Sequence, residues 1–103
     1  MKANSNAQFQ RGSGNVFADL GFSPEEAANL RLRSQLLTAL RKYIERSGMT
    51  QAESARRFRV TQPRISDLVR GKLSRFSLDT LVKLAEDAGL DVEFRIRERR
   101  RVA

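Results

Sequence analysis

The stretch TQAESARRFRVTQPRISDLVRG, residues 50–71, carries two short helical patterns joined by a tight turn. Thr50 followed three residues later by Glu53 forms a capping box, which starts a helix. Thr61 caps a second helix, and Pro63 fits its first turn, where backbone N–H groups have no acceptor within the helix. Apolar residues fall where two such helices would pack on each other, at positions 52, 55, 58, 60, 65, 68 and 69. The stretch therefore predicts two helices held at a fixed angle.

The outward face of the second helix, residues 62–70, favours binding to DNA. Two helices with this spacing are typical of a helix-turn-helix, whose second helix enters the major groove. Gln and Arg bond bidentately to adenine and guanine, and Ser contacts a base or a phosphate. An acid repels phosphate unless it accepts from a cytosine amino group or pairs with a cation, here Arg64 or Arg70, and for Asp67 we favour the ion pair. We predict base readout by Gln62, Arg64, Ser66 and Asp67. The alternative is a helical hairpin with a solvated polar face.

Contacts to the DNA backbone are expected on both sides of this helix. Gln51 stands at the start of the preceding helix, where both its side chain and the helix N-terminus can face a phosphate. The loop after Gly71 is basic and can hold the backbone further along. The predicted backbone contacts are Gln51, Thr61, Arg70, Lys72, Ser74 and Arg75.

The composition agrees with a polyanionic partner. The 103 residues include 20 Lys and Arg against 12 Asp and Glu, a net charge of +8. The chain has no Cys and no His, which excludes zinc fingers, disulfides and the commonest general base. No catalytic motif is present, so we expect no enzyme, cofactor, metal site or small-molecule substrate. Without a signal peptide or a long apolar run, the expected location is the cytoplasm, at the nucleoid, with no membrane partner.

The flanking sequence predicts a mainly α fold of four to five helices. Ser23-Pro24 begins a long helix that ends at Gly48, and Ser77 begins a last helix that ends at Gly89. We expect residues 1–14 to form a flexible arm, 15–97 the DNA-binding domain and 98–103 a basic tail.

The pattern after Gly89 changes from helical to alternating, which predicts one β-strand at the C-terminal end of the domain. A lone strand cannot satisfy its backbone groups, so it needs a partner. The candidates are the apolar run 16–20 of the same chain and the same strand of a second protomer, and the second is favoured. The side chains expected to dimerise the protein are Leu90, Val92, Phe94 and Ile96.

Residues spaced through 51–71 make the chain resemble the phage-repressor or Cro type of helix-turn-helix, the XRE family. The matching residues are Gln51, Ala55, Arg59-Val60-Thr61, Ile65-Ser66 and Gly71. In that family the first-helix Gln braces the backbone and the first recognition residues read bases, which the resemblance places at Gln51 and at Gln62, Arg64, Ser66 and Asp67. Arg59 departs from the family, which commonly has Gly in the turn, so a left-handed backbone there would be strained by about 1 kcal/mol. Pro63 replaces a commoner polar residue.

Further pieces are similar to the HigA-type antitoxins within this family: Gly14 to Gly21, Gln62 to Leu68, Arg70 to Lys72 and Phe76 to Leu81. This resemblance implies a homodimeric repressor that binds an inverted repeat in its own promoter and neutralises a partner toxin, usually a ribonuclease. The alternatives are a stand-alone phage-type transcriptional regulator and a protein-interaction module that does not bind DNA.

Overall fold

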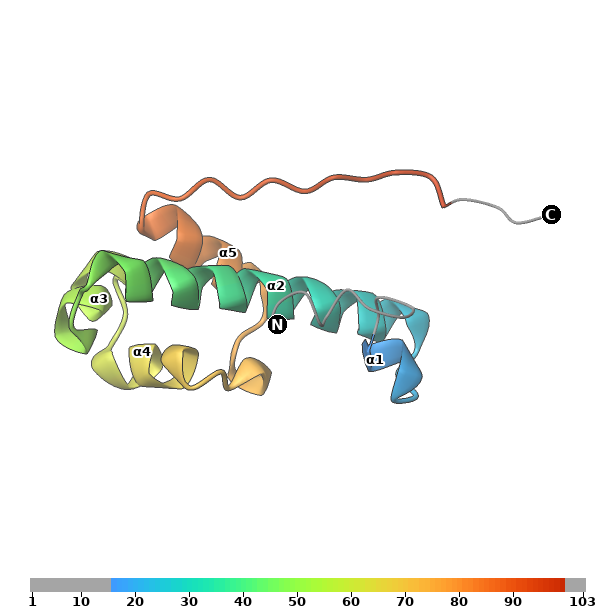
Figure 1. Ribbon diagram of the computed structural model, residues 1–103, viewed down its shortest axis with the longest axis horizontal. Coiled ribbons are helices and arrows are strands. Elements are labelled where there is room, and N and C mark those ends of the chain that lie inside the picture. Colours follow the sequence, from blue (N-terminus) through green and yellow to red (C-terminus); the bar gives the residue numbers. More distant parts are fainter. Residues whose placement is uncertain (1–15, 100–103) are drawn as a thin grey trace.

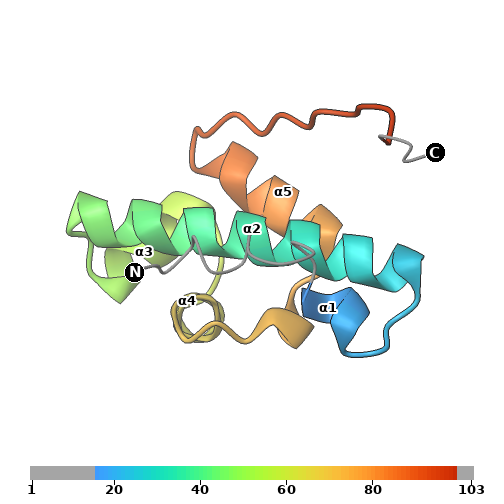
Figure 2. The same cartoon turned by 45° about the vertical axis from the view of Figure 1, so that its right-hand side comes forward.

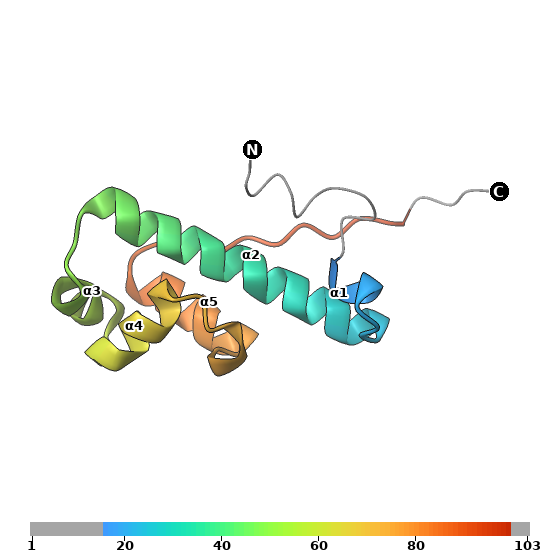
Figure 3. The same ribbon diagram turned by 60° about the horizontal axis from the view of Figure 1, so that its bottom comes forward.

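One long helix, α2 (Pro24–Ser47), runs through the molecule, and the other helices pack along it (Figure 1). The computed structural model describes residues 16–99. The helices α3 (Gln51–Phe58), α4 (Gln62–Val69) and α5 (Leu78–Asp87) gather around the C-terminal part of α2, while α1 (Val16–Asp19) packs near its start (Figures 1 and 3). A short 3₁₀ turn, η2 (Leu73–Arg75), joins α4 to α5. The mainly helical prediction is therefore confirmed.

Local signals fix the limits of α2, as the sequence predicted. The Ser23 hydroxyl accepts from the Glu26 amide at 3.2 Å, and the Glu26 carboxylate accepts from the Ser23 amide at 3.2 Å. Gly48 ends the helix in the left-handed region, with φ of 73°. Ser77 likewise caps α5, because its hydroxyl accepts from the Thr80 amide at 3.1 Å. These bonds join residues only three positions apart, so the sequence alone determines them.

The core lies between α2, α3, α4 and α5. Phe58, Leu40 and Ile65 are fully buried at its centre, and Tyr43 meets the Phe58 ring edge-on with centroids 6.1 Å apart. Phe76, in the connection before α5, is also buried. The remaining buried apolar side chains of this cluster are Leu37, Ile44, Ala55, Leu68, Leu81, Leu84, Ala85 and Ala88. This core holds α3 and α4 at a fixed angle.

One core position expected in α3 is wrong. Ala52 is exposed, and Ser54 is buried in its place beside Ala55 and Phe58. The helix turns its 54, 55 and 58 positions toward α4 and α5, and residue 52 lies outside that face. The Ser54 hydroxyl has no hydrogen-bond partner.

The turn between α3 and α4 carries the strained residue that the sequence predicted. Arg59 has φ of 60° and ψ of 44°, and it is the one non-glycine residue with positive φ among residues 16–99. The Val60 amide donates to the Ala55 carbonyl at 3.0 Å, which closes the helix end around it. Arg59 therefore pays about 1 kcal/mol of backbone strain that glycine would avoid.

The strand expected at residues 90–96 is not formed, because Leu90 to Arg99 have neither helix nor strand. The intrachain partner considered for it is wrong, since Val16–Asp19 form helix α1. A strand requires a hydrogen-bonded neighbour, and α1 offers no extended edge. The segment after α5 instead runs back in the direction of the start of α2 (Figures 1 and 2).

The alternation of this segment holds only in its first half. Leu90 and Val92 are half-buried and pack against the core. Phe94 is 57% exposed and Ile96 is 95% exposed, so the part of the chain that the structure describes leaves both side chains largely open. The arm 1–14 lies outside the described residues, as do residues 100–103 of the tail. No helix within 16–99 is long and apolar enough to cross a membrane.

Candidate nucleic-acid interface

The first turns of α3 and α4 carry two of the predicted site residues, Gln51 and Gln62, and both are exposed. The Thr50 hydroxyl accepts from the Glu53 amide at 3.1 Å, and the Glu53 carboxylate accepts from the Thr50 amide at 2.8 Å. The bond from the Thr50 amide to the Glu53 carboxylate is the main cause that holds the pKa of the Glu53 carboxyl below its ordinary value, and a hydrogen bond with the Thr50 side chain and the charge of Arg56 add to the effect. The box leaves Gln51 exposed in the first turn of α3.

The start of α4 differs in one respect from its prediction. Thr61 has the extended backbone of an N-cap, yet its hydroxyl makes no capping hydrogen bond. Its side chain is exposed beside Gln62 and Pro63, which are also exposed. The three side chains therefore form an open edge at the first turn of α4.

The two faces of α4 divide as the sequence predicted. Ile65 and Leu68 are fully buried and fix the helix against the core. Ser66 is half-buried and Arg70, the helix C-cap, is exposed. The outward face is thus held by an apolar face that cannot rotate without exposing the core.

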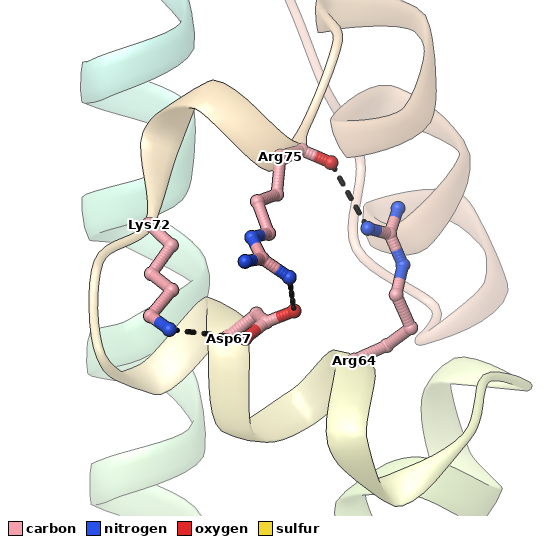
Figure 4. Close-up of polar contacts among 4 residues, drawn as sticks. All are labelled: Arg64, Asp67, Lys72 and Arg75. Atoms are coloured by element: carbon pink, nitrogen blue, oxygen red, sulfur yellow. Dashed lines mark hydrogen bonds and ion pairs between the residues drawn. The ribbon is translucent and has the colours of Figure 1, made fainter.

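The Arg64 guanidinium turns toward the loop that follows α4 (Figure 4). Its Nη1 donates to the Arg75 carbonyl at 2.9 Å, and its Cζ lies 4.3 Å from the centroid of the Phe76 ring. A guanidinium stacked on an aromatic face gains cation–π energy there. Arg64 consequently braces the loop in the free protein, a role that its place in the sequence did not indicate.

The Asp67 carboxylate pairs with two cations of the same loop (Figure 4). Its Oδ1 lies 3.9 Å from Lys72 Nζ, and its Oδ2 lies 3.5 Å from Arg75 Nη1. The prediction of an ion pair is confirmed, but the expected partners, Arg64 and Arg70, are wrong. The reason is the backbone path, since the chain turns after α4 and brings residues 72 and 75 back over Asp67.

The long helix anchors this loop through a residue that the sequence analysis did not single out. Arg33 of α2 donates from Nη1 to the Leu73 carbonyl at 3.3 Å and to the Phe76 carbonyl at 3.0 Å. Its Nε donates to Asn29 Oδ1 at 2.9 Å, which orients the guanidinium. No sequence signal distinguishes Arg33 from the other arginines of α2, because its acceptors lie about 40 positions away.

The loop after α4 places two cations beside Asp67. Gly71 has φ of 74°, which allows the chain to reverse direction at the end of α4. Ser74 and Arg75 are exposed after it, and Lys72 is partly exposed. Of the predicted residues, the structure joins Arg64, Asp67, Lys72 and Arg75 in one cluster (Figure 4), while Gln51 and Gln62 lie in the first turns of α3 and α4. Residues 16–99 contain no group of acids suited to bind a metal.

Comparisons with known proteins agree with this geometry. The family model described as a helix-turn-helix domain matches residues 16–97. A solved structure named as a candidate XRE family transcriptional regulator is 33% identical, with a TM-score of 0.68 over 76% of this chain and 91% of that chain. No curated protein matches the chain. The matched region includes α1 and the segment after α5, so the likeness is not confined to α3 and α4. The chain therefore belongs to the XRE-type family of helix-turn-helix domains.

Proposed function

We propose that the protein is a sequence-specific DNA-binding transcriptional repressor that acts at the nucleoid in the cytoplasm. The observation that carries this proposal is the outward face of α4 beside the braced basic loop of residues 72–75. A buried core fixes the reading helix, and the loop presents cations at a defined position relative to it. Arg33 and Arg64 both hold the loop of residues 72–75 in place. A helical hairpin whose polar face is only solvated does not require a loop held in this way.

In the proposed complex α4 enters the major groove with its first turn leading. Gln62 and Ser66 contact base edges, and Asp67 is close enough to the same face to accept from a base amino group. Gln51 and the start of α3 contact one phosphate, where the N-terminal end of the helix dipole favours a negative charge. Lys72, Ser74 and Arg75 contact the backbone on the other side of the groove, and Thr61 and Arg70 complete the backbone contacts.

The proposed active form is a homodimer that binds an inverted repeat. The segment after α5 supports this, because it is extended and leaves Phe94 and Ile96 exposed. Pairing with the same segment of a second protomer would satisfy its backbone groups and cover both side chains. Leu90 and Val92 would then attach the paired segments to each core.

Footprinting on the DNA upstream of the coding sequence tests the DNA-binding proposal. The expected result is protection of two half-sites about one helical turn apart, because a two-fold dimer presents its two reading helices at that spacing. Sedimentation of the protein and of Ile96→Lys measures the oligomer, and a monomeric variant with unchanged helical content is expected. Absence of binding to any duplex at low salt would favour a protein-interaction module.

We further propose that the repressor is the antitoxin of a toxin–antitoxin pair and regulates its own operon. The supporting observation is a group of exposed apolar side chains outside the core, Val16, Leu20 and Phe22, at the start of the described chain. Exposed apolar side chains that cluster are typical of protein–protein contacts. Expression of the adjacent gene alone and together with this chain tests the proposal. Growth arrest relieved by the chain supports an antitoxin, and no arrest indicates a stand-alone regulator.

A further inference from the structure

An acid lies among the cations of the surface proposed to bind DNA. Asp67 is 17% exposed, and its carboxylate faces Lys72 Nζ at 3.9 Å and Arg75 Nη1 at 3.5 Å. Both cations are more open to solvent, at 36% and 57%. The carboxylate therefore neutralises part of the charge that the loop would offer to a phosphate.

The stability of α4 does not explain this acid. Asp67 lies in the last turn of the helix, where the dipole disfavours a negative charge. Its two ion pairs are long and partly exposed, and pairs of this kind add little to the stability of a fold. The loop is held in place by other bonds, from Arg33 to the Leu73 and Phe76 carbonyls and from Arg64 to the Arg75 carbonyl.

We propose that Asp67 is a specificity-determining residue that withholds Lys72 and Arg75 from phosphates until its carboxylate is given another donor. The inference rests on the proposed DNA-binding function. On a cognate site, the amino group of a cytosine or adenine in the major groove takes over as the donor to Asp67. Lys72 and Arg75 are then free to pair with the backbone.

On a non-cognate sequence no base donor meets the carboxylate. Asp67 then keeps its two cations, or it loses them to phosphates and remains unpaired close to the negatively charged backbone. Either outcome costs non-specific affinity, which depends almost wholly on phosphate contacts. The residue thus increases the ratio of specific to non-specific binding by weakening the latter, which is how repulsive elements create specificity.

The experiment compares Asp67→Asn with Asp87→Asn on a random-sequence duplex over a range of salt concentrations. Asp87 is a matched control, because it is 19% exposed and pairs with one cation, Lys83 Nζ, at 2.9 Å. It is the last residue of α5, and it belongs neither to α4 nor to the loop that follows α4. Each change raises the net charge by one, so a general charge effect is the same in both variants.

Asp67→Asn is expected to bind the random duplex on the order of tenfold more tightly near 0.1 M salt, with a salt dependence steeper by about one to two units, because each freed cation adds about 0.9. Asp87→Asn should bind like the unchanged protein.

On the footprinted site, Asp67→Asn should lose affinity because the amide is a poorer acceptor for the base amino group. Equal effects of the two variants on the random duplex would overturn the inference and leave DNA binding intact. No binding by any of the three proteins would overturn both.

A second variant separates withheld cations from direct repulsion of phosphate. In the background of Lys72→Gln with Arg75→Gln, Asp67→Asn has no cations to release, so its gain on random duplex should disappear. A gain of undiminished size in that background would overturn the inference, since Asp67 would then act on phosphate directly. Circular dichroism of each variant confirms the fold, because all four substituted side chains are at least partly exposed.

Discussion

The helix-turn-helix part of the molecule and its two ends differ in how completely they cover their apolar side chains. Helices α3, α4 and α5 close over Phe58, Ile65 and Leu81, which are fully buried. The large apolar side chains left exposed within residues 16–99 all lie in the ends: Val16, Leu20, Phe22, Phe94 and Ile96. The helix-turn-helix part therefore buries its own large apolar side chains. The two ends leave theirs exposed, and exposed apolar side chains that cluster are typical of protein–protein contacts.

The largest expected effect is a difference in the free energy of unfolding between a substitution in the helix-turn-helix part and one in the C-terminal end. Phe58→Ala removes a fully buried ring at the junction of α2 and α3, so it should lower the free energy of unfolding by about 3–5 kcal/mol. Phe94→Ala removes a ring of the same size that is mostly exposed, and it should change the unfolding of the monomer little. Urea denaturation of both variants at low protein concentration measures the difference. Similar losses would mean that the segment after α5 is covered within the monomer.

The second prediction distinguishes a residue proposed to contact bases, Gln62, from a residue that holds the loop after α4 in place, Arg64. Gln62 is exposed, and in the proposed complex it contacts base edges and no phosphate, so Gln62→Ala should lower affinity for the footprinted site by about 1–3 kcal/mol and leave random-sequence binding unchanged. Arg64→Ala releases the loop from Phe76 and from the Arg75 carbonyl, so it should weaken binding to both duplexes. Fluorescence anisotropy on the two duplexes gives the comparison. Loss confined to the footprinted site for Arg64→Ala would restore Arg64 as a base reader.

A smaller effect tests the strain at the turn. Arg59→Gly should raise the free energy of unfolding by about 0.5–1 kcal/mol, since glycine removes the left-handed penalty but adds freedom to the unfolded chain. Thermal denaturation measures the change. Arg46→Gly, a substitution in the last turn of α2 at negative φ, is the control and should destabilise. A destabilised Arg59→Gly variant would show that the Arg59 side chain contributes more than its strain costs.

The smallest effect concerns the capping box of α3. Hydrogen bonds from Thr50 lower the folded-state pKa of Glu53 below its unfolded value. The stabilisation is therefore fully present above the unfolded pKa and is lost as the pH falls through the folded pKa. Glu53→Gln should remove this part of the acid dependence of unfolding, and the control is Glu86→Gln, a change at an exposed residue of α5. Unfolding midpoints measured from neutral to acidic pH compare them, and identical slopes for both variants would contradict the assignment.

The sequence by itself determined the helices α2 to α5, the caps that begin α2, α3 and α5, and the turn between α3 and α4. Ser23 with Glu26, Thr50 with Glu53, and the left-handed Arg59 all depend on backbone and side-chain groups within about four positions. The buried and exposed faces of α4 likewise follow from the helical period. Local chemistry of this range needs no knowledge of distant residues, so the helix-turn-helix could be predicted before the fold was known.

Only the tertiary structure decided which charged side chains meet. Asp67 has cations on either side of it in sequence, and the path of the loop selects Lys72 and Arg75 over Arg64 and Arg70. Arg33 reaches its acceptors from another helix, and Arg64 turns back onto Phe76. The failed strand has the same origin, because alternation describes a strand's faces but cannot supply its hydrogen-bonded neighbour. The partner of a long flexible side chain or of a strand edge depends on which groups the tertiary fold places close to it. Those groups can lie far away in the sequence, so the residues next to it in the chain do not identify them.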